Sequence, residues 1–164
     1  MSNRSQTDPL PNLHAVATAD TADTARFFEI LRDALDATLG HTLLTAMRYH
    51  RDSGDTERFY SSNPDAYPVG GRKHPTPGFW MQRLFVEGRP YIGYHADDIR
   101  EVFADHELII SLGCESILNL PVRHHDHVIG TINILHEAGW YSEGDVPLGE
   151  TFAALALPAF LNLP

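Results

Sequence analysis

Residues 112–136 contain two apolar stretches separated by a short polar break, residues 124–127 (HHDH). Within each stretch the side chains alternate between two faces with a period of two. Such alternation on both sides of a polar break is typical of a β-hairpin. Both faces are largely apolar, which indicates that other parts of the chain cover both of them. The polar exceptions, which need partners if they are buried, are Ser116, Asn119, Thr131 and Asn133.

Upstream of this hairpin the apolar pattern predicts a helix and a second hairpin. Between residues 20 and 40, apolar residues recur at helical spacing with charged residues on the opposite face, and Gly40 ends the pattern. Residues 42–49 and 57–62 read as strands joined by a turn-rich segment. Residues 1–19 are polar and contain two prolines, so we expect a flexible arm before a single domain of residues 20–164.

The middle of the chain is less regular. Residues 63–78 contain four prolines and three glycines, which predicts a functional or mobile loop. A short helix is expected over residues 79–86, and an edge strand over residues 89–94 because of Pro90. Helices follow up to Gly113. These elements predict an α+β domain with the terminal helices on one sheet face and the irregular middle on the other.

The end of the chain predicts one more helix. It is expected to start near Asp145, with Pro147 in its first turn, where proline is tolerated. Pro158 is expected to kink or end it.

Composition narrows the classes of function. The 164 residues suit one domain, and a formal net charge of −10 argues against nucleic-acid binding and against anionic membranes. No apolar segment is long enough to span a bilayer. Cys114 is the only cysteine, which excludes an intramolecular disulfide and a cysteine-based zinc site and suits a reducing cytoplasm.

Residues 113–122 (GCESILNLPV) and 128–135 (VIGTINIL) resemble the closing hairpin of GAF domains, and the order of elements matches over about residues 20–161. The resemblance implies a central antiparallel sheet with helices on one face and a small-molecule pocket on the other, roofed by the middle loops and short helices. It also implies a sensory or regulatory role and a homodimer, because family members often dimerise through their terminal helices.

The chain departs from three ligand-specific groups of that family. The stand-alone reductases of free methionine sulfoxide use several cysteines, whereas Cys114 is alone here. The residues around Cys114 lack the pattern of bilin attachment, and no cyclic-nucleotide pattern follows Asn119 or Asn133. The sequence therefore identifies no cofactor. The histidines of residues 124–127 read as an exposed polar turn rather than a metal site.

The candidate site lies mainly in residues 59–80. Gly70 and Gly71 allow a sharp turn, and the adjacent Arg72 and Lys73 offer positive charge for a carboxylate or phosphate. Aromatic side chains supply flat walls with polar tips. Asn119 and His106 are expected to orient a ligand by hydrogen bonds. The predicted site therefore consists of Tyr60, Tyr67, Arg72, Lys73, Trp80, His106 and Asn119.

Two alternatives to ligand sensing remain open. One is an enzyme that uses His106 as a base oriented by Asp105, or Cys114 as a nucleophile. For Asp105 the competing interpretation is a helix N-cap, and for Cys114 it is a small buried residue. The other alternative is a protein-interaction module without a ligand.

Overall fold

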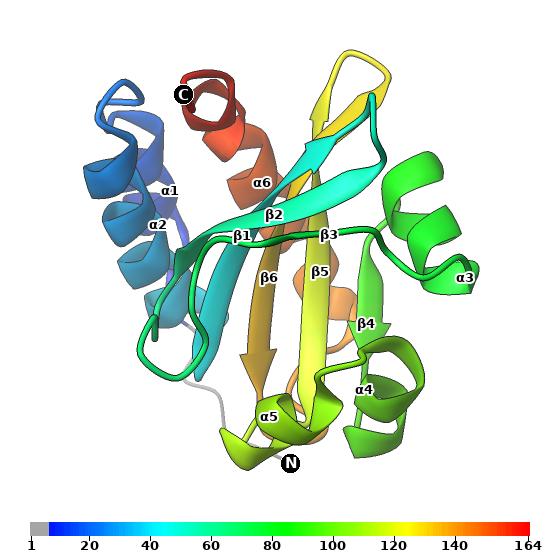
Figure 1. The fold of residues 1–164 in the computed structure, drawn as a ribbon. Coiled ribbons are helices and arrows are strands. Elements are labelled where there is room, and N and C mark those ends of the chain that lie inside the picture. Colours follow the sequence, from blue (N-terminus) through cyan, green and yellow to red (C-terminus); the bar gives the residue numbers. More distant parts are fainter. Residues whose placement is uncertain (1–6) are drawn as a thin grey trace.

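A six-stranded antiparallel sheet forms the centre of the computed structural model, which describes residues 7–164. Its strand order is β3-β2-β1-β6-β5-β4 (Figure 1). The strands are β1 (Leu43–His50), β2 (Asp55–Ser61), β3 (Arg72–Lys73), β4 (Tyr91–Gly93), β5 (Ser116–His124) and β6 (His127–His136). The predicted edge strand is β4, and β3 lies within the segment that we expected to be irregular.

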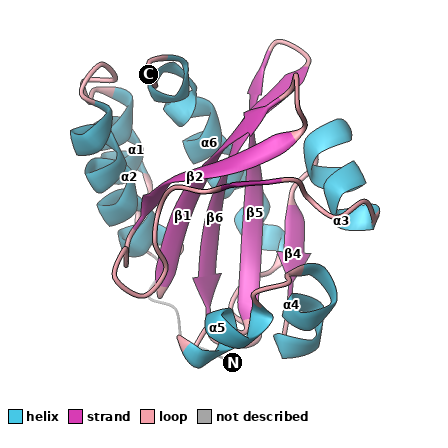
Figure 2. Cartoon of the chain, in the orientation of Figure 1, coloured by secondary structure: helices cyan, strands magenta, loops and turns pink. Residues whose placement is uncertain are grey.

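Helices cover the two faces of this sheet unequally (Figures 1 and 2). One face carries the longer helices α1 (Leu10–Ala17), α2 (Thr24–Thr38) and α6 (Val146–Leu161), the last preceded by a 3₁₀ turn, Glu143–Asp145. The other face carries short ones: α3 (Phe79–Met81), a π-helical turn (Gln82–Val86), α4 (Ala96–Val102) and α5 (His106–Ser111). This arrangement confirms the predicted α+β architecture. No helix among residues 7–164 is long and apolar enough to cross a membrane.

The β5–β6 hairpin has the predicted alternation, and its register settles which polar residues share a face. Asn119 pairs with Asn133, so both point to the face that bears the short helices. The residues that precede them, Leu118 and Ile132, point to the opposite face and are fully buried in the core with residues of α2 and α6. Each strand of the hairpin therefore supplies both the main core and the floor of the opposite face.

The N-terminal segment differs from the predicted arm. Residues 10–17 form α1, which packs on α2 and α6, and Val16 is buried in the core. Pro9 is the N-cap and Pro11 lies in the first turn, where the missing N–H needs no helical partner. The prolines that suggested an arm therefore begin a helix. The part of the predicted arm in residues 1–6 lies outside the described residues.

Strand β2 contains a bulge that reverses its alternation. Ala46 of β1 pairs with Tyr60, but the next β1 residue, Met47, pairs with Arg58, so Phe59 is an extra residue. As a result Phe59 and Tyr60 both turn to the helix-covered face, where their ring centroids lie 5.0 and 5.7 Å from that of Phe28. Plain alternation would have placed Tyr60 on the same face as Arg58.

Helix α6 continues past Pro158 to Leu161, so of the two predicted effects of this proline, ending the helix does not occur. The expected short helix over residues 79–86 is present, but most of it is the π-helical turn. These two local differences do not change the layers of the fold.

Candidate functional site

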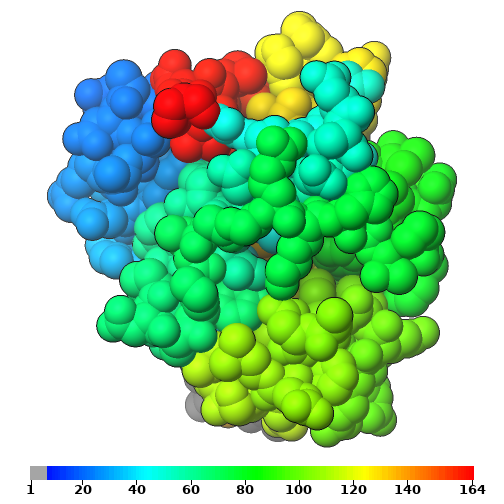
Figure 3. Space-filling view, in the orientation of Figure 1, coloured from blue at the N-terminus to red at the C-terminus, as the bar shows by residue number. Residues whose placement is uncertain are grey.

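A cavity of about 490 Å³ lies between the sheet and the short helices. Its floor is formed by β1, β2, β5 and β6, and its roof by α3, α4 and α5. The segment Lys73–Gly78, which we call the strap, crosses the open side, and every residue of the strap lines the cavity. In the space-filling view the face is hollowed beside this segment (Figure 3).

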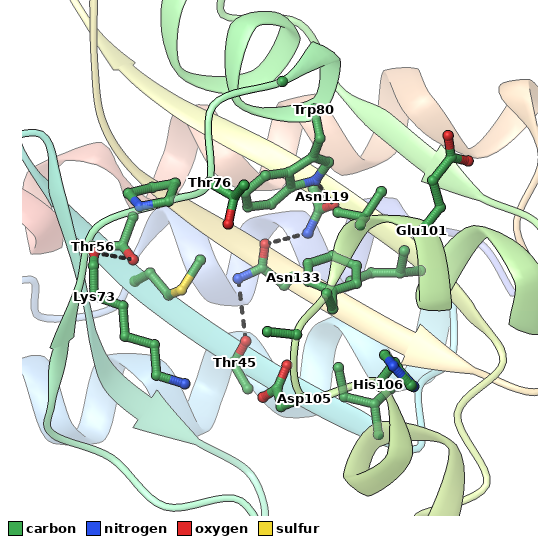
Figure 4. Close-up of a pocket in the computed structure, with 18 of the residues that line it drawn as sticks. Thr45, Thr56, Lys73, Thr76, Trp80, Glu101, Asp105, His106, Asn119 and Asn133 are labelled. Carbon is green, nitrogen blue, oxygen red and sulfur yellow. Dashed lines mark hydrogen bonds between the residues drawn. The ribbon is translucent and has the colours of Figure 1, made fainter.

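A chain of buried polar side chains crosses the floor (Figure 4). The Asn119 amide donates to the Asn133 side-chain oxygen at 2.7 Å. The Asn133 amide then donates to the hydroxyls of Thr45 and Thr131, both at 3.2 Å. The chain thus links β5, β6 and β1, and buried polar groups that bond to one another hold a defined geometry at the base of the cavity.

Trp80 connects the roof to this floor. Its indole N–H donates to the Asn119 side-chain oxygen at 3.0 Å. The indole ring also packs edge-on against Phe85 and Phe103, with centroid distances of 5.5 and 5.3 Å. Trp80 therefore forms an aromatic wall whose position depends on the polar chain below it.

Arg58, Tyr67 and Asp105 form a stacked group at one side of the cavity. The Arg58 guanidinium carbon lies 3.8 Å from the centroid of the Tyr67 ring, and its Nη1 donates to the Pro68 carbonyl at 3.0 Å. The Tyr67 hydroxyl donates to Asp105 Oδ2 at 2.6 Å. Burial raises the pKa of Tyr67, and the hydrogen bond to Asp105 raises it further, so the phenol remains a donor. Arg58 Nε is buried and has no hydrogen-bond partner among the described residues.

Arg72 and Lys73 point to opposite sides of the strand that they form. Lys73 pairs with Thr56 and lines the cavity, whereas Arg72 pairs with Glu57. The Arg72 guanidinium lies 3.2 Å from Ser53 Oγ, to which it donates, and 3.8 Å from Asp55 Oδ2. Adjacent strand residues alternate in direction, so only one cation of this pair can face the cavity. Of the two cations selected from the sequence, Lys73 therefore lines this cavity and Arg72 does not.

Asp55 anchors the start of the strap. One of its carboxylate oxygens lies 3.2 Å from His74 Nδ1, and the other is 3.8 Å from Arg72 Nε. The hydrogen bond with His74, aided by Ser53 and Arg72, holds the pKa of the Asp55 carboxyl below its ordinary value. A single carboxylate thus ties both ends of the Arg72–His74 segment to the β1–β2 turn.

The residues considered for catalysis are not arranged as a catalytic pair. Asp105 and His106 both line the cavity, but the Asp105 carboxylate accepts its hydrogen bond from Tyr67 and makes no capping bond to α5. Cys114 is fully buried and lies outside the cavity lining. Burial raises the pKa of its thiol to about 11, which keeps it protonated at neutral pH. No group of three or more His, Cys, Asp or Glu side chains that could hold a metal occurs within residues 7–164.

The structure brings together most of the residues selected from the sequence. The five that line the cavity are Tyr67, Lys73, Trp80, His106 and Asn119. Tyr60 does not, because the β2 bulge turns it onto Phe28, and Arg72 does not, because it faces away from Lys73. Arg58 also lines the cavity but was not selected from the sequence. The one feature that could have indicated it is its position two residues after Thr56, because alternate residues of a strand share a face.

Comparisons with known proteins agree with this fold. A family model described as GAF domain matches residues 21–160. Among solved structures, the GAF domain of a phosphoenolpyruvate-protein phosphotransferase from Coxiella burnetii is 15% identical, with a TM-score of 0.69, covering 93% of each chain. The GAF domain of a two-component sensor histidine kinase from Bacillus halodurans is 12% identical, with a TM-score of 0.67, covering 82% of this chain and 91% of that one.

A third similar structure is an enzyme, the type II free methionine-R-sulfoxide reductase from Thermoplasma acidophilum. It is 14% identical, with a TM-score of 0.66, and the match covers 87% of this chain and 96% of that one. At such identities these structures show a shared fold. No curated protein matches the chain.

Proposed function

Because the chain belongs to the GAF domain family, we propose that it is a sensory or regulatory domain that binds one small polar or anionic molecule in the cavity under the strap. The observation that carries the proposal is the cavity itself. Its volume of about 490 Å³ falls within the range of small-molecule sites, and it combines apolar walls with a few fixed polar groups. A protein-interaction module without a ligand has no need of such a space.

Each lining residue has a role in this proposal. Lys73 supplies positive charge, and Arg58 takes the role that the sequence analysis assigned to Arg72. Tyr67 and Trp80 supply flat surfaces, His106 supplies a hydrogen-bonding group, and Asn119 orients the ligand indirectly by holding Trp80 in place.

Native mass spectrometry of the purified full chain tests the proposal. We expect an additional small mass on the folded protein that is lost on denaturation. A Met47→Trp variant fills the cavity from β1 and is expected to lose this mass, whereas Val69→Trp, at an exposed position outside the cavity lining, retains it. A bare protein that no compound of a metabolite library stabilises against heat would reject ligand sensing.

We further propose that the chain acts in the cytoplasm as a homodimer. The single buried thiol is consistent with a reducing compartment. Exposed leucines on the terminal helices, Leu10 in α1 and Leu161 in α6, are candidate dimer contacts. The net charge of −10 argues against nucleic acid and anionic membranes as partners. The same native spectrum reports the oligomeric state, and a purely monomeric species would reject the dimer.

Catalysis has less support than binding. A cysteine mechanism would need the Cys114 thiol to reach the cavity, but this thiol is buried elsewhere with a raised pKa. A His106–Asp105 base would need a hydrogen bond between the two side chains, and among residues 7–164 the Asp105 carboxylate instead accepts from the Tyr67 hydroxyl at 2.6 Å.

A further inference from the structure

We infer that the ligand is a small monocarboxylate with a largely apolar body, and that Arg58 and Lys73 hold its carboxylate at the β2–β3 end of the cavity. The inference rests on the proposed function, because it specifies the chemistry of the molecule proposed to bind there.

The first support is the placement of the two cations. Lys73 of β3 pairs with Thr56 of β2, and Arg58 lies two residues further along β2 on the same face. Diagonal neighbours of this kind have Cβ atoms roughly 7–8 Å apart, so two long side chains can reach one anion between them. The Lys73 ammonium has no hydrogen bond or ion pair with the described residues and points from β3 toward the side of the cavity that contains Asp105 (Figure 4).

The second support is the unpaired donor of Arg58. Its Nη1 is occupied by the Pro68 carbonyl, whereas Nε is buried without a partner among residues 7–164. Buried donors without partners are rare in folded proteins and call for an acceptor. The Nε edge of a guanidinium presents two parallel N–H groups, which match the two oxygens of a carboxylate. Stacking on Tyr67 holds this edge in a fixed plane.

The charge balance favours a single negative charge on the ligand. Arg58 stacks on Tyr67, which bonds to the carboxylate of Asp105, and Lys73 points to the same side, so this side has two cations and one carboxylate. One ligand carboxylate therefore neutralises this end of the cavity, and a second negative charge would be left unpaired in a partly desolvated space. Glu101 lies across the cavity from Lys73 and is exposed (Figure 4).

The remaining ionisable groups of the lining have partners of their own or lie elsewhere. Arg100 donates to Asp97 at 2.8 Å, and His74 is held by Asp55. His106 lies on the roof side, at the start of α5. None of the three therefore changes the charge balance between Arg58 and Lys73.

The walls favour an apolar ligand body. Beyond the two cations, the lining includes the apolar side chains of Met47, Val102, Phe103, Ile109, Ile117 and Leu135. The polar side chains of the floor need no hydrogen bond from the ligand, because Asn119 bonds to Trp80 and to Asn133, and Asn133 bonds to two threonines. A planar or branched hydrocarbon body beneath Trp80 thus leaves no floor amide without its present partner.

Calorimetric titration with matched probes tests this inference. The probes are phenylacetate, hexanoate and indole-3-acetate, each compared with its neutral amide, and phenyl phosphate as a doubly charged analogue. We expect at least one carboxylate to bind about tenfold more tightly than its amide and than phenyl phosphate, the factor typical of one charge-assisted hydrogen bond.

Three charge-neutralising variants locate the effect. Arg58→Gln and Lys73→Gln are each expected to weaken carboxylate binding about tenfold without changing amide binding. Arg51→Gln is the control, since it removes a cation at an exposed position of the β1–β2 turn outside the cavity lining, and we expect carboxylate affinity to stay within about twofold. Lys73 is exposed, so its variant keeps the test informative if Arg58→Gln fails to fold.

The outcomes separate this inference from the proposed function. A panel in which no carboxylate binds more tightly than its amide overturns the inference, as does an equal loss in Arg51→Gln. If native mass spectrometry then still shows a bound molecule, ligand sensing stands and only the ligand class is wrong. If no molecule is bound and no library compound stabilises the protein, both proposals fail.

Discussion

The Trp80 indole N–H donates to the side-chain oxygen of Asn119, and this 3.0 Å hydrogen bond joins the roof of the cavity to the middle of the sheet. The two residues are 39 positions apart in the chain. Because Asn119 is itself bonded to Asn133, a continuous chain of hydrogen bonds links Trp80 in the roof to both β5 and β6.

Removing this hydrogen bond should destabilise the domain. A Trp80→Phe variant keeps an aromatic ring but leaves the buried Asn119 oxygen without its donor, and we expect unfolding free energy to fall by about 1–3 kcal/mol. Urea unfolding followed by circular dichroism measures the change. Val86→Ala, at an exposed position of the same segment, is the control and should change the unfolding free energy by about 0.5 kcal/mol or less. Equal effects in both variants would show that the bond contributes nothing.

Gly130 in β6 should not tolerate a side chain. A Cβ at this position would collide with the Met47 carbonyl oxygen and with the ring of Phe160. The carbonyl belongs to the neighbouring strand and cannot move aside, so we expect Gly130→Ala to cost about 3 kcal/mol or more, at the upper end for overpacking. Gly144→Ala is the matched control, because the nearest atom to its Cβ, Ser142 Oγ, is 3.6 Å away. A thermal melt of Gly130→Ala that matches Gly144→Ala would contradict the prediction.

The sequence was most informative where local periodicity and tertiary packing agree. The β5–β6 hairpin was predicted because its alternation continues on both sides of the turn, and its buried faces confirm it. In β2 the alternation breaks at the Phe59 bulge, and no residue pattern in the sequence predicts this bulge. Tyr60, which we selected for the site, therefore lies on the helix-covered face and not at the cavity. Arg58 was overlooked for the same reason, since its direction depends on the pairing of β2 with β1.

Sequence alone also leaves open where a helix begins and which way the side chains of a short strand point. Pro9 and Pro11 suggested a loose arm, although proline is also suited to the first turn of a helix, and only the packing of Val16 on α2 and α6 distinguishes the two. Likewise, Arg72 and Lys73 could be recognised as a basic pair, but not as residues of opposite orientation, until β3 was seen to pair with β2.

Loss of the Asp55 carboxylate should loosen the strap. In Asp55→Asn the charged partner of both His74 and Arg72 is removed, so we expect faster hydrogen–deuterium exchange over residues 72–79 by mass spectrometry. Asp52→Asn, in the same turn, is the control and should leave exchange unchanged. In the wild-type protein the same loosening should appear only at acidic pH, below 3.8, because the pKa of Asp55 is lowered from that ordinary value. Unchanged exchange in Asp55→Asn would show that the two β3 residues alone hold the strap.

The protein should lose stability in alkaline solution. Burial raises the pKa of Cys114 from 9.0 to about 11, so the unfolded chain releases this proton at lower pH than the folded one. The contribution is fully present below pH 9 and is lost as pH rises toward 11, and a shift of this size corresponds to about 3 kcal/mol. Urea unfolding between pH 8 and 11 measures the decline.

A Cys114→Ala variant isolates the thiol from other alkaline groups. Its packing loss is independent of pH, so its unfolding free energy should start lower and decline less steeply than that of the wild type. Part of the decline should remain, because burial also raises the pKa of Tyr91 to about 12. If the unfolding free energy of the two proteins declined equally steeply with pH, the Cys114 thiol would not contribute to the alkaline loss of stability.

The bulge in β2 divides that strand into two segments that can change independently. Before it, Thr56 and Arg58 present their side chains to the cavity, and after it, Phe59 and Tyr60 belong to the aromatic cluster around Phe28. Redesign of ligand preference can therefore be confined to the first segment without repacking the hydrophobic interior. Deleting Phe59 would instead make the alternation plain while Arg58 still faces the cavity and Tyr60 still faces the core, so its cost would fall on the aromatic cluster around Phe28 and not on ligand recognition.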